Sequence, residues 1–308
     1  MSLSKNPLLL FTDLVNQHSE MYNHHGPESK KQSYFDTRSV RNSLIPVLFA
    51  YLLIILSAVD KKALLIDVIK PTSAAIATAF SLVVVYRQKT DGIIGKAFTL
   101  LAAGLTLFLI GELISSYNDI AIGIENSLPS IEYVFWTIAY GPIFYFVFKM
   151  YYFLGASHSK THQILICIVG AVFLTCFISL TSQNAEFSTQ RGIASFLISI
   201  VYPVFDVVLI VPSALILLNP VKGSLTSIPW IFLAVLILGI GDSIFAYTFN
   251  VRAMEDLNWI SKLFFITSYV IASGGYFGII NFLYAIRNKQ IFLKDWIVSF
   301  ANIQQISF

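Results

Sequence analysis

The sequence predicts an all-α protein: a polytopic membrane helix bundle of about eight transmembrane helices, composed of two similar four-helix halves in parallel orientation. Three observations favour this fold class. Of the 308 residues, 56% are hydrophobic and only 12% are charged, whereas soluble domains carry about 25% charged residues. The hydrophobic residues gather in runs close to the ~20 residues that a membrane-spanning helix needs. Finally, one short motif recurs 130 residues later in the chain.

Taken in order, the chain begins with a polar segment, residues 1–42, which we expect to form a cytoplasmic tail. Eight apolar runs follow. They are residues 44–59, 68–86, 93–117, 131–154, 164–180, 193–218, 228–247 and 259–284. The first and fifth runs are short for a span, so seven spans are the main alternative to eight. No signal peptide is recognisable before the first run.

The distribution of Lys and Arg predicts the orientation. With eight spans, six of the 20 basic residues fall on one side, and the other 14 fall on the side of the amino terminus. The six are Lys61, Lys62, Lys70, Arg191, Arg252 and Lys262. We therefore expect a cell-membrane protein with both termini cytoplasmic and an external loop at about residues 118–130.

The repeated motif predicts an internal duplication. A shift of 130 residues aligns Gly111, Glu112 and Tyr117 with Gly241, Asp242 and Tyr247. A shift of 132 residues aligns Lys70-Pro71 with Tyr202-Pro203. Halves with an even number of spans keep the same orientation in the membrane. The predicted units are a first half at 43–154, a second half at 155–286, and an amphipathic carboxy-terminal segment at 287–308.

Acidic residues inside spans are the first candidates for a functional site, because an ionised side chain in the bilayer core costs several kcal/mol unless it is paired or hydrated. Glu112, Asp206 and Asp242 lie within the predicted spans. Ligand or ion binding in a polar cavity is one interpretation, and hydrogen-bonded packing of helices is the other.

The sixth span carries a polar stripe around Asp206. Helical periodicity places Ser195, Ser199, Tyr202, Asp206 and Ser213 on one face, which must point into the protein. Together with the three acids, Tyr202 and Ser199 complete the set of candidate cavity residues. Pro203 and Pro212 free backbone carbonyls on this span, which only protein groups or water can satisfy.

The fourth span carries an aromatic stripe at spacings of three and four residues. The stripe is either the wall of an apolar pocket or packing combined with interfacial aromatic belts. Its residues are Tyr133, Trp136, Tyr140, Phe144, Phe148 and Tyr151.

The remaining patterns argue against a resident cofactor and a catalytic centre. All five histidines lie in tails or near a membrane edge, and no lysine lies at the middle of a span to bind retinal. No sequence motif of a hydrolase, a zinc site or a nucleotide-binding loop occurs. Cys167 and Cys176 lie on opposite faces of one helix and cannot bridge each other. We expect no catalytic residues, no metal, no cofactor and no nucleic-acid partner.

Several of these residues resemble a known group of membrane regions. The residues are Gly111-Glu112 with Tyr117, Leu128-Pro129-Ser130-Ile131, Val134-Phe135, Tyr202-Pro203 followed by Asp206, and Gly241-Asp242-Ser243. Over about residues 95–285 the chain is similar to the multi-helix membrane-sensor regions that precede histidine kinase or diguanylate cyclase domains. It departs from them at Tyr133, where the group usually has Asp, and no output domain follows in this chain.

The resemblance implies sensing of a stimulus in or across the membrane. The leading functional hypothesis is a sensor-type or signalling-associated protein without its own output domain. Its partners are the lipid bilayer and a cytoplasmic signalling protein reached through the carboxy-terminal helix, which lies on the membrane surface or extends as a signalling helix. A transporter of a small cation or metabolite and a structural subunit of a membrane complex are the alternatives. The oligomeric state stays open.

Overall fold

The structure is a computed structural model that describes residues 59–88, 92–122, 130–154, 160–183, 188–218, 227–250 and 258–305, together with Ile45, Phe49 and Leu52. For residues 285–305 it describes the helical backbone alone. Within these ranges the regular structure is entirely helical, as predicted. The helices are α3 (Val59–Gln88), α4 (Gly92–Tyr117), the π-helical η1 (Asn118–Ile122), α5 (Ile131–Phe153), α6 (Lys160–Gln183), α7 (Gln190–Leu218), α8 (Ile228–Asn250) and α9 (Asn258–Gln305).

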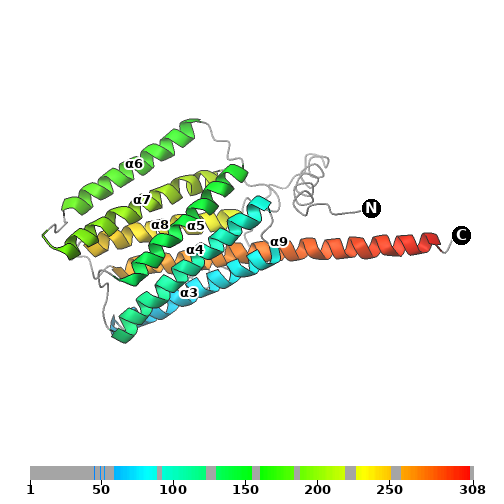
Figure 1. Ribbon diagram of the computed structural model, residues 1–308, viewed down its shortest axis with the longest axis horizontal. Coiled ribbons are helices and arrows are strands. Elements are labelled where there is room, and N and C mark those ends of the chain that lie inside the picture. The colour runs from blue at the N-terminus through cyan, green and yellow to red at the C-terminus, as the bar shows by residue number, and fades with distance from the viewer. Residues whose placement is uncertain are drawn as a thin grey trace.

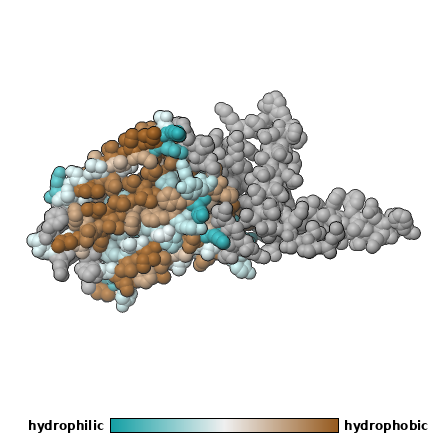
Figure 2. Space-filling view, turned by 45° about the horizontal axis from the view of Figure 1, so that its top comes forward, coloured by the Kyte–Doolittle hydropathy of each residue, from teal (hydrophilic) through white to brown (hydrophobic). Residues whose placement is uncertain are grey.

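Seven of these helices, α3 to α9, are long and apolar enough to cross a membrane, counting only the part of the chain that the structure describes. They correspond to the last seven predicted runs and indicate an integral membrane protein. The first predicted run, residues 44–59, lies almost wholly outside the described residues. Apolar side chains cover the visible face of the bundle, and hydrophilic residues lie mainly toward its two ends (Figure 2). Such a belt suits a lipid environment.

Six of the helices form a closed ring, in which each helix contacts two neighbours in the order α3, α4, α5, α7, α8, α9 and back to α3. The helices lie roughly side by side, and helices that follow each other along the chain run in opposite directions (Figure 1). The short connections between successive helices explain the alternation, because they leave room only for antiparallel neighbours. The end at which α3, α5, α7 and α9 begin is called the outer end here, after the predicted orientation, and the opposite end is the inner end.

The seventh spanning helix, α6, lies outside the ring and packs mainly on α7. Its apolar side chains are largely exposed, including Ile168, Val172 and Leu180, and both cysteines are exposed and free. An apolar helix that buries so little of its surface in protein needs lipid or another apolar partner around it.

Close contact between α4 and α5 depends on glycine. A Cβ atom added at Gly104 would lie 2.7 Å from Cγ1 of Ile143, and one added at Gly111 would lie 2.5 Å from Nε1 of Trp136. Small residues let two helix backbones approach in this way. Because α5 lies so near α4, its aromatic side chains reach across the ring toward α7 and α8.

Two charged regions differ from the sequence prediction. Helix α3 begins at Val59, before the predicted run at 68–86, so Asp67 lies within the helix together with Lys70, which the sequence analysis counted among the charges of the outer side. The predicted external loop at 118–130 also begins with helix, because η1 continues α4 through Ile122. Ion pairing explains both extensions, since an acid or a base can stay in a helix end near the bilayer once its charge is compensated.

Candidate functional site

Three helices meet at the hydroxyl group of Tyr140. This α5 residue lies 2.7 Å from Oδ1 of Asp206 on α7 and 2.6 Å from Oδ2 of Asp242 on α8. The side chain of Ser243 donates a further hydrogen bond, 3.2 Å long, to Oδ2 of Asp206. Tyr140 is 1% exposed, Asp206 is 0% exposed and Asp242 is 8% exposed. We call Tyr140, Asp206 and Asp242 the acid triad.

A second polar group contains Glu112 on α4, which has a cation beside it. Its Oε2 atom lies 2.6 Å from Nζ of Lys70 on α3, and both side chains are buried. Its Oε1 atom accepts a 3.1 Å hydrogen bond from the hydroxyl of Tyr269 on α9. The Lys70 ammonium also lies 5.7 Å from the centre of the Trp136 ring. The arrangement compensates the negative charge of Glu112 and links α3, α4 and α9.

A third polar group lies nearer the outer end. Lys262, close to the start of α9, is 2.5 Å from Oδ1 of Asp67 on α3 and 3.4 Å from Oδ2 of Asp119 on η1. Through these two ion pairs, Lys262 connects α9 to both α3 and η1. Polar groups therefore continue from the outer end of the bundle inward to Glu112.

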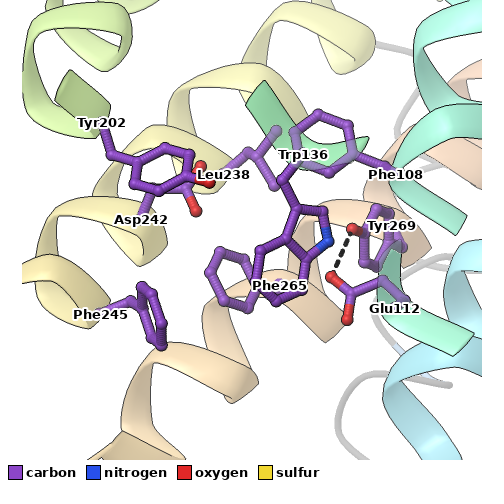
Figure 3. A pocket seen from close by; sticks show the side chains of 9 residues that line it. All are labelled: Phe108, Glu112, Trp136, Tyr202, Leu238, Asp242, Phe245, Phe265 and Tyr269. Atoms are coloured by element: carbon purple, nitrogen blue, oxygen red, sulfur yellow. Dashed lines mark hydrogen bonds between the residues drawn. The ribbon is translucent and has the colours of Figure 1, made fainter. Parts of the chain in front are cut away.

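A small cavity of about 20 Å³ separates Glu112 from the acid triad. In Figure 3, Asp242 and Tyr202 lie on one side of it, Glu112 and Tyr269 lie on the other, and Trp136 lies between them. The apolar part of the lining consists of Phe108, Leu238, Phe245 and Phe265. A water molecule needs about 10–15 Å³ and two to four polar partners. The cavity has room and polar neighbours for one water molecule, and none for a metabolite.

The inner half of the bundle is closed by aromatic packing. Phe146 of α5 stacks on Phe232 of α8 with ring centres 5.5 Å apart, and it contacts Phe98 of α4 at 5.4 Å. All three side chains are buried. Within the described residues, the buried acidic and basic side chains thus gather in the outer half and the middle of the core, and these packed aromatic rings form a hydrophobic plug toward the inner end.

The predicted site residues occupy different places. Glu112 and Asp242 line the same cavity, whereas Asp206 does not line it and is linked to Asp242 through the hydroxyl of Tyr140. Tyr202 also lines the cavity, and its hydroxyl is 3.4 Å from both the carbonyl of Tyr133 and Oγ1 of Thr137. Ser199 does not line the cavity.

The polar stripe of α7 faces the protein as predicted, since Ser199, Tyr202, Asp206 and Ser213 are all buried. Ser199 donates a 3.2 Å hydrogen bond to the carbonyl of Ala246 and so fastens α7 to α8. The side chain of Ser195 lies outside the described part of the structure.

Sequence reasoning missed the partners of the acids. Lys70 and Lys262 lie near the outer ends of predicted runs and were counted only as charges of the outer side, whereas in the structure both pair with carboxylates. Tyr140 was predicted only as a member of an aromatic stripe that lines a pocket or packs. A tyrosine at the middle of a span was the available signal, because a buried hydroxyl group must find a hydrogen-bond partner.

The aromatic stripe itself divides between the two predicted roles. Trp136 lines the cavity, Tyr133 and Tyr140 are buried, and Phe148 is 40% exposed toward the surroundings of the bundle.

The site gives no sign of a metal centre within the described residues, where no three His, Cys, Asp or Glu side chains are grouped suitably for a metal ion.

Comparison of the chain with known proteins leaves the site as the main guide to function. No protein-family model matches the sequence, no curated protein matches it, and no solved structure matches its fold.

Proposed function

We propose that this integral membrane protein is a sensor-type module, in which a change at the cavity between Glu112 and the acid triad is passed to α9. The observation that carries the proposal is the double role of α9. Its first half supplies Lys262 and Tyr269, which bind acids of α3, η1 and α4. The same helix then continues well beyond the last residue of its candidate span, Asn281, and ends at Gln305.

The length of α9 supports transmission of a signal away from the membrane. A helix of 48 residues is about 72 Å long, and the bilayer core accounts for only about 30 Å of that. In Figure 1, α9 projects from the inner end of the bundle as one continuous helix. Of the two predicted arrangements, this geometry favours a signalling helix that reaches a cytoplasmic partner.

The position of the polar groups favours sensing over transport. The three polar groups occupy the outer half and the middle of the bundle, and the packed rings of Phe98, Phe146 and Phe232 close the inner half. A stimulus from the outer side can reach the cavity region through polar groups. A transported ion would still have to pass the aromatic plug.

Transport of a small cation or proton is the second candidate, and the acid triad is the observation in its favour. Acidic groups at mid-membrane are common on ion pathways. Proton or cation flux into proteoliposomes that disappears in Asp206→Asn would place transport first.

The sensor proposal predicts that the charge of Glu112 sets the position of α9. Cys167 and Cys176 are exposed, so both are first replaced by alanine. Spin labels are then attached at residue 152, an exposed position at the inner end of α5, and at residue 288 of α9. Electron-electron resonance gives the distance between them in lipid nanodiscs. We expect Glu112→Gln to shift this distance distribution, because Tyr269 and Lys70 lose their charged partner.

Glu132→Gln is the matched control. Glu132 is also buried, but its carboxylate bonds to Asn118 and Ser130, and no hydrogen bond or ion pair joins it to a described residue of α9. Identical distance distributions in the parent protein and in Glu112→Gln would overturn the sensor proposal. An equal shift in Glu132→Gln would show a general response of the bundle and would also contradict it.

A further inference from the structure

The acid triad presents a problem of hydrogen counting. A phenol hydroxyl group has one hydrogen atom to donate, and an ionised carboxylate can only accept. Nevertheless the oxygen of Tyr140 lies 2.7 Å from one carboxylate and 2.6 Å from the other. Both contacts are hydrogen bonds only if a second hydrogen is present, and that hydrogen must come from one of the carboxyl groups.

No cation offers an alternative source of compensation. Among the described residues, no lysine or arginine lies within ion-pair distance of Asp206 or Asp242. Two ionised carboxylates held around one hydroxyl, both deeply buried, would repel each other without the screening of water. From this geometry we infer that the acid triad is a proton-binding site: one aspartate is a neutral acid that donates to Tyr140, and Tyr140 donates to the other, ionised aspartate.

Comparison with Glu112 supports a proton in this position. In both places an acid of the Gly-acid motif lies within hydrogen-bond distance of a tyrosine hydroxyl on another helix, Tyr269 for Glu112 and Tyr140 for Asp242. Beside Glu112 the ammonium of Lys70 completes the group. Beside Asp242 a second carboxyl, that of Asp206, takes the place of a cation. The first acid is therefore compensated by a lysine, and the second requires a proton.

The cavity gives the proton a connection to the outer polar groups. The Nε1 atom of Trp136 is buried and has no hydrogen-bond partner among the described residues. In Figure 3 this nitrogen points to the side of the cavity where Glu112 and Tyr269 lie. One water molecule in the cavity would accept from Trp136 and donate to a carboxylate, which satisfies the orphan donor. Such a water would stand between Glu112 and Asp242, which both line the cavity.

The charged and titratable groups that face the triad from neighbouring helices leave its charge uncompensated. Glu112 and Lys70 carry opposite charges and pair with each other. Tyr202 of α7 and Tyr269 of α9 are neutral, and Ser243 of α8 supplies a hydroxyl. Loss of the proton would therefore leave two negative charges on α7 and α8 with no nearby counter-charge. Repulsion would separate these helices, and α8 packs directly against α9.

The proton site deepens the proposed function, since it names the proton as the stimulus, and it rests on that function only for its consequence in α9. Infrared spectroscopy tests the site alone. A protonated carboxyl group has a carbonyl stretch well separated from the bands of carboxylates and amides. We expect purified protein at neutral pH to show such a band, to lose it as the pH is raised, and to lose it in Asp206→Asn or Asp242→Asn.

Glu132→Gln serves as the matched control, because it removes a different buried carboxyl and should keep the band that Asp242→Asn removes. Absence of any protonated-carboxyl band from the unmodified protein at neutral pH would overturn the inference. So would a band that survives in both asparagine variants. The measurement on unmodified protein does not depend on whether the variants fold. A failure of this test leaves the response of α9 to Glu112→Gln unaffected, so the two proposals can fail separately.

Discussion

The ion pair between Lys70 and Glu112 lies deep enough in the bundle for its energetics to differ from those of a surface pair. Both side chains are almost fully buried, at 4% and 3% exposure, and the two charged atoms are 2.6 Å apart. Transfer of each charge out of water costs several kcal/mol, and the pair offsets this cost only while both partners are present. Removal of a single partner is therefore worse than removal of both.

This reasoning predicts a strongly non-additive pair of substitutions. Lys70→Met should destabilise the protein by about 3–5 kcal/mol, because it leaves the Glu112 carboxylate buried without a cation. Lys70→Met combined with Glu112→Gln should recover much of the loss, since glutamine is neutral and can still accept from Tyr269. Unfolding by denaturing detergent in mixed micelles measures both variants.

The control for this prediction is Lys96→Met, which removes an exposed lysine of α4 and should change stability by less than about 1 kcal/mol. The interpretation fails if Lys70→Met behaves like Lys96→Met. Equal destabilisation in the single and double variants would also contradict it.

At the scale of residues, the sequence identified the acids that lie in the core but not the side chains that pair with them. The cost of charge in a bilayer identified Glu112, Asp206 and Asp242, and all three lie in or beside the buried polar core. Depth along a helix does not determine which helices are neighbours, so the bridging position of Tyr140 could not be predicted. The pairing of Lys70 was missed because Lys70 lies near the outer end of its predicted run, 68–86, and was counted only as a charge of the outer side.

The contact between α4 and α5 is close beside the cavity, and it depends on the absence of a side chain at Gly111. The nearest atoms to a Cβ at this position belong to Trp136, at 2.5 Å and 2.6 Å. Trp136 in turn lines the cavity. A methyl group at residue 111 must push the indole, and with it one wall of the cavity.

Gly111→Ala is therefore expected to destabilise the bundle by about 1–3 kcal/mol through overpacking. Gly141→Ala on α5 is the matched control, because a Cβ there meets nothing within 4 Å. Alanine is also the better helix former, so this control should be neutral or slightly stabilising. Detergent-induced unfolding compares the two variants. Equal stability of the two alanine variants would show that Gly111 does not hold α4 against α5.

The relation between α4 and α8 bears on the predicted duplication. Gly111 of α4 packs on Trp136 of the next helix, and Gly241 of α8 packs on Phe264 and Phe265 of the next helix. The acid that follows each glycine bonds to a tyrosine of the opposite predicted half. These contacts are reciprocal between α4 and α8, and the internal repeat itself stays a prediction. The two four-helix halves remain a prediction, because the first predicted span lies outside the described residues.

Over the whole molecule, composition and the length of apolar runs were sufficient to predict the fold class. Seven of the eight predicted runs correspond to helices that can span a membrane. The arrangement of the ring could not be predicted, because packing of apolar helices in lipid depends on the fit of small residues and not on hydrophobicity. The peripheral position of α6 is an example, since its sequence is as apolar as that of the central helices.

The two ends of the bundle differ in the chemistry of their buried side chains. Polar groups connect the outer end to the acid triad, aromatic rings close the inner half, and α9 passes through both zones to Gln305. A change of charge in the middle of the bundle can therefore alter the position of a helix that extends beyond it. The acid triad and α9 are thereby coupled through the proposed change of charge.

The most direct measurement of this coupling is the distance between spin labels at residues 152 and 288, followed from acidic to alkaline pH in nanodiscs. The distance should change as the triad loses its proton in the parent protein. In Asp242→Asn it should stay constant, because the amide can donate to Tyr140 at any pH and carries no charge. A distance that is independent of pH in the parent protein, or that changes identically in Asp242→Asn, would contradict the claim.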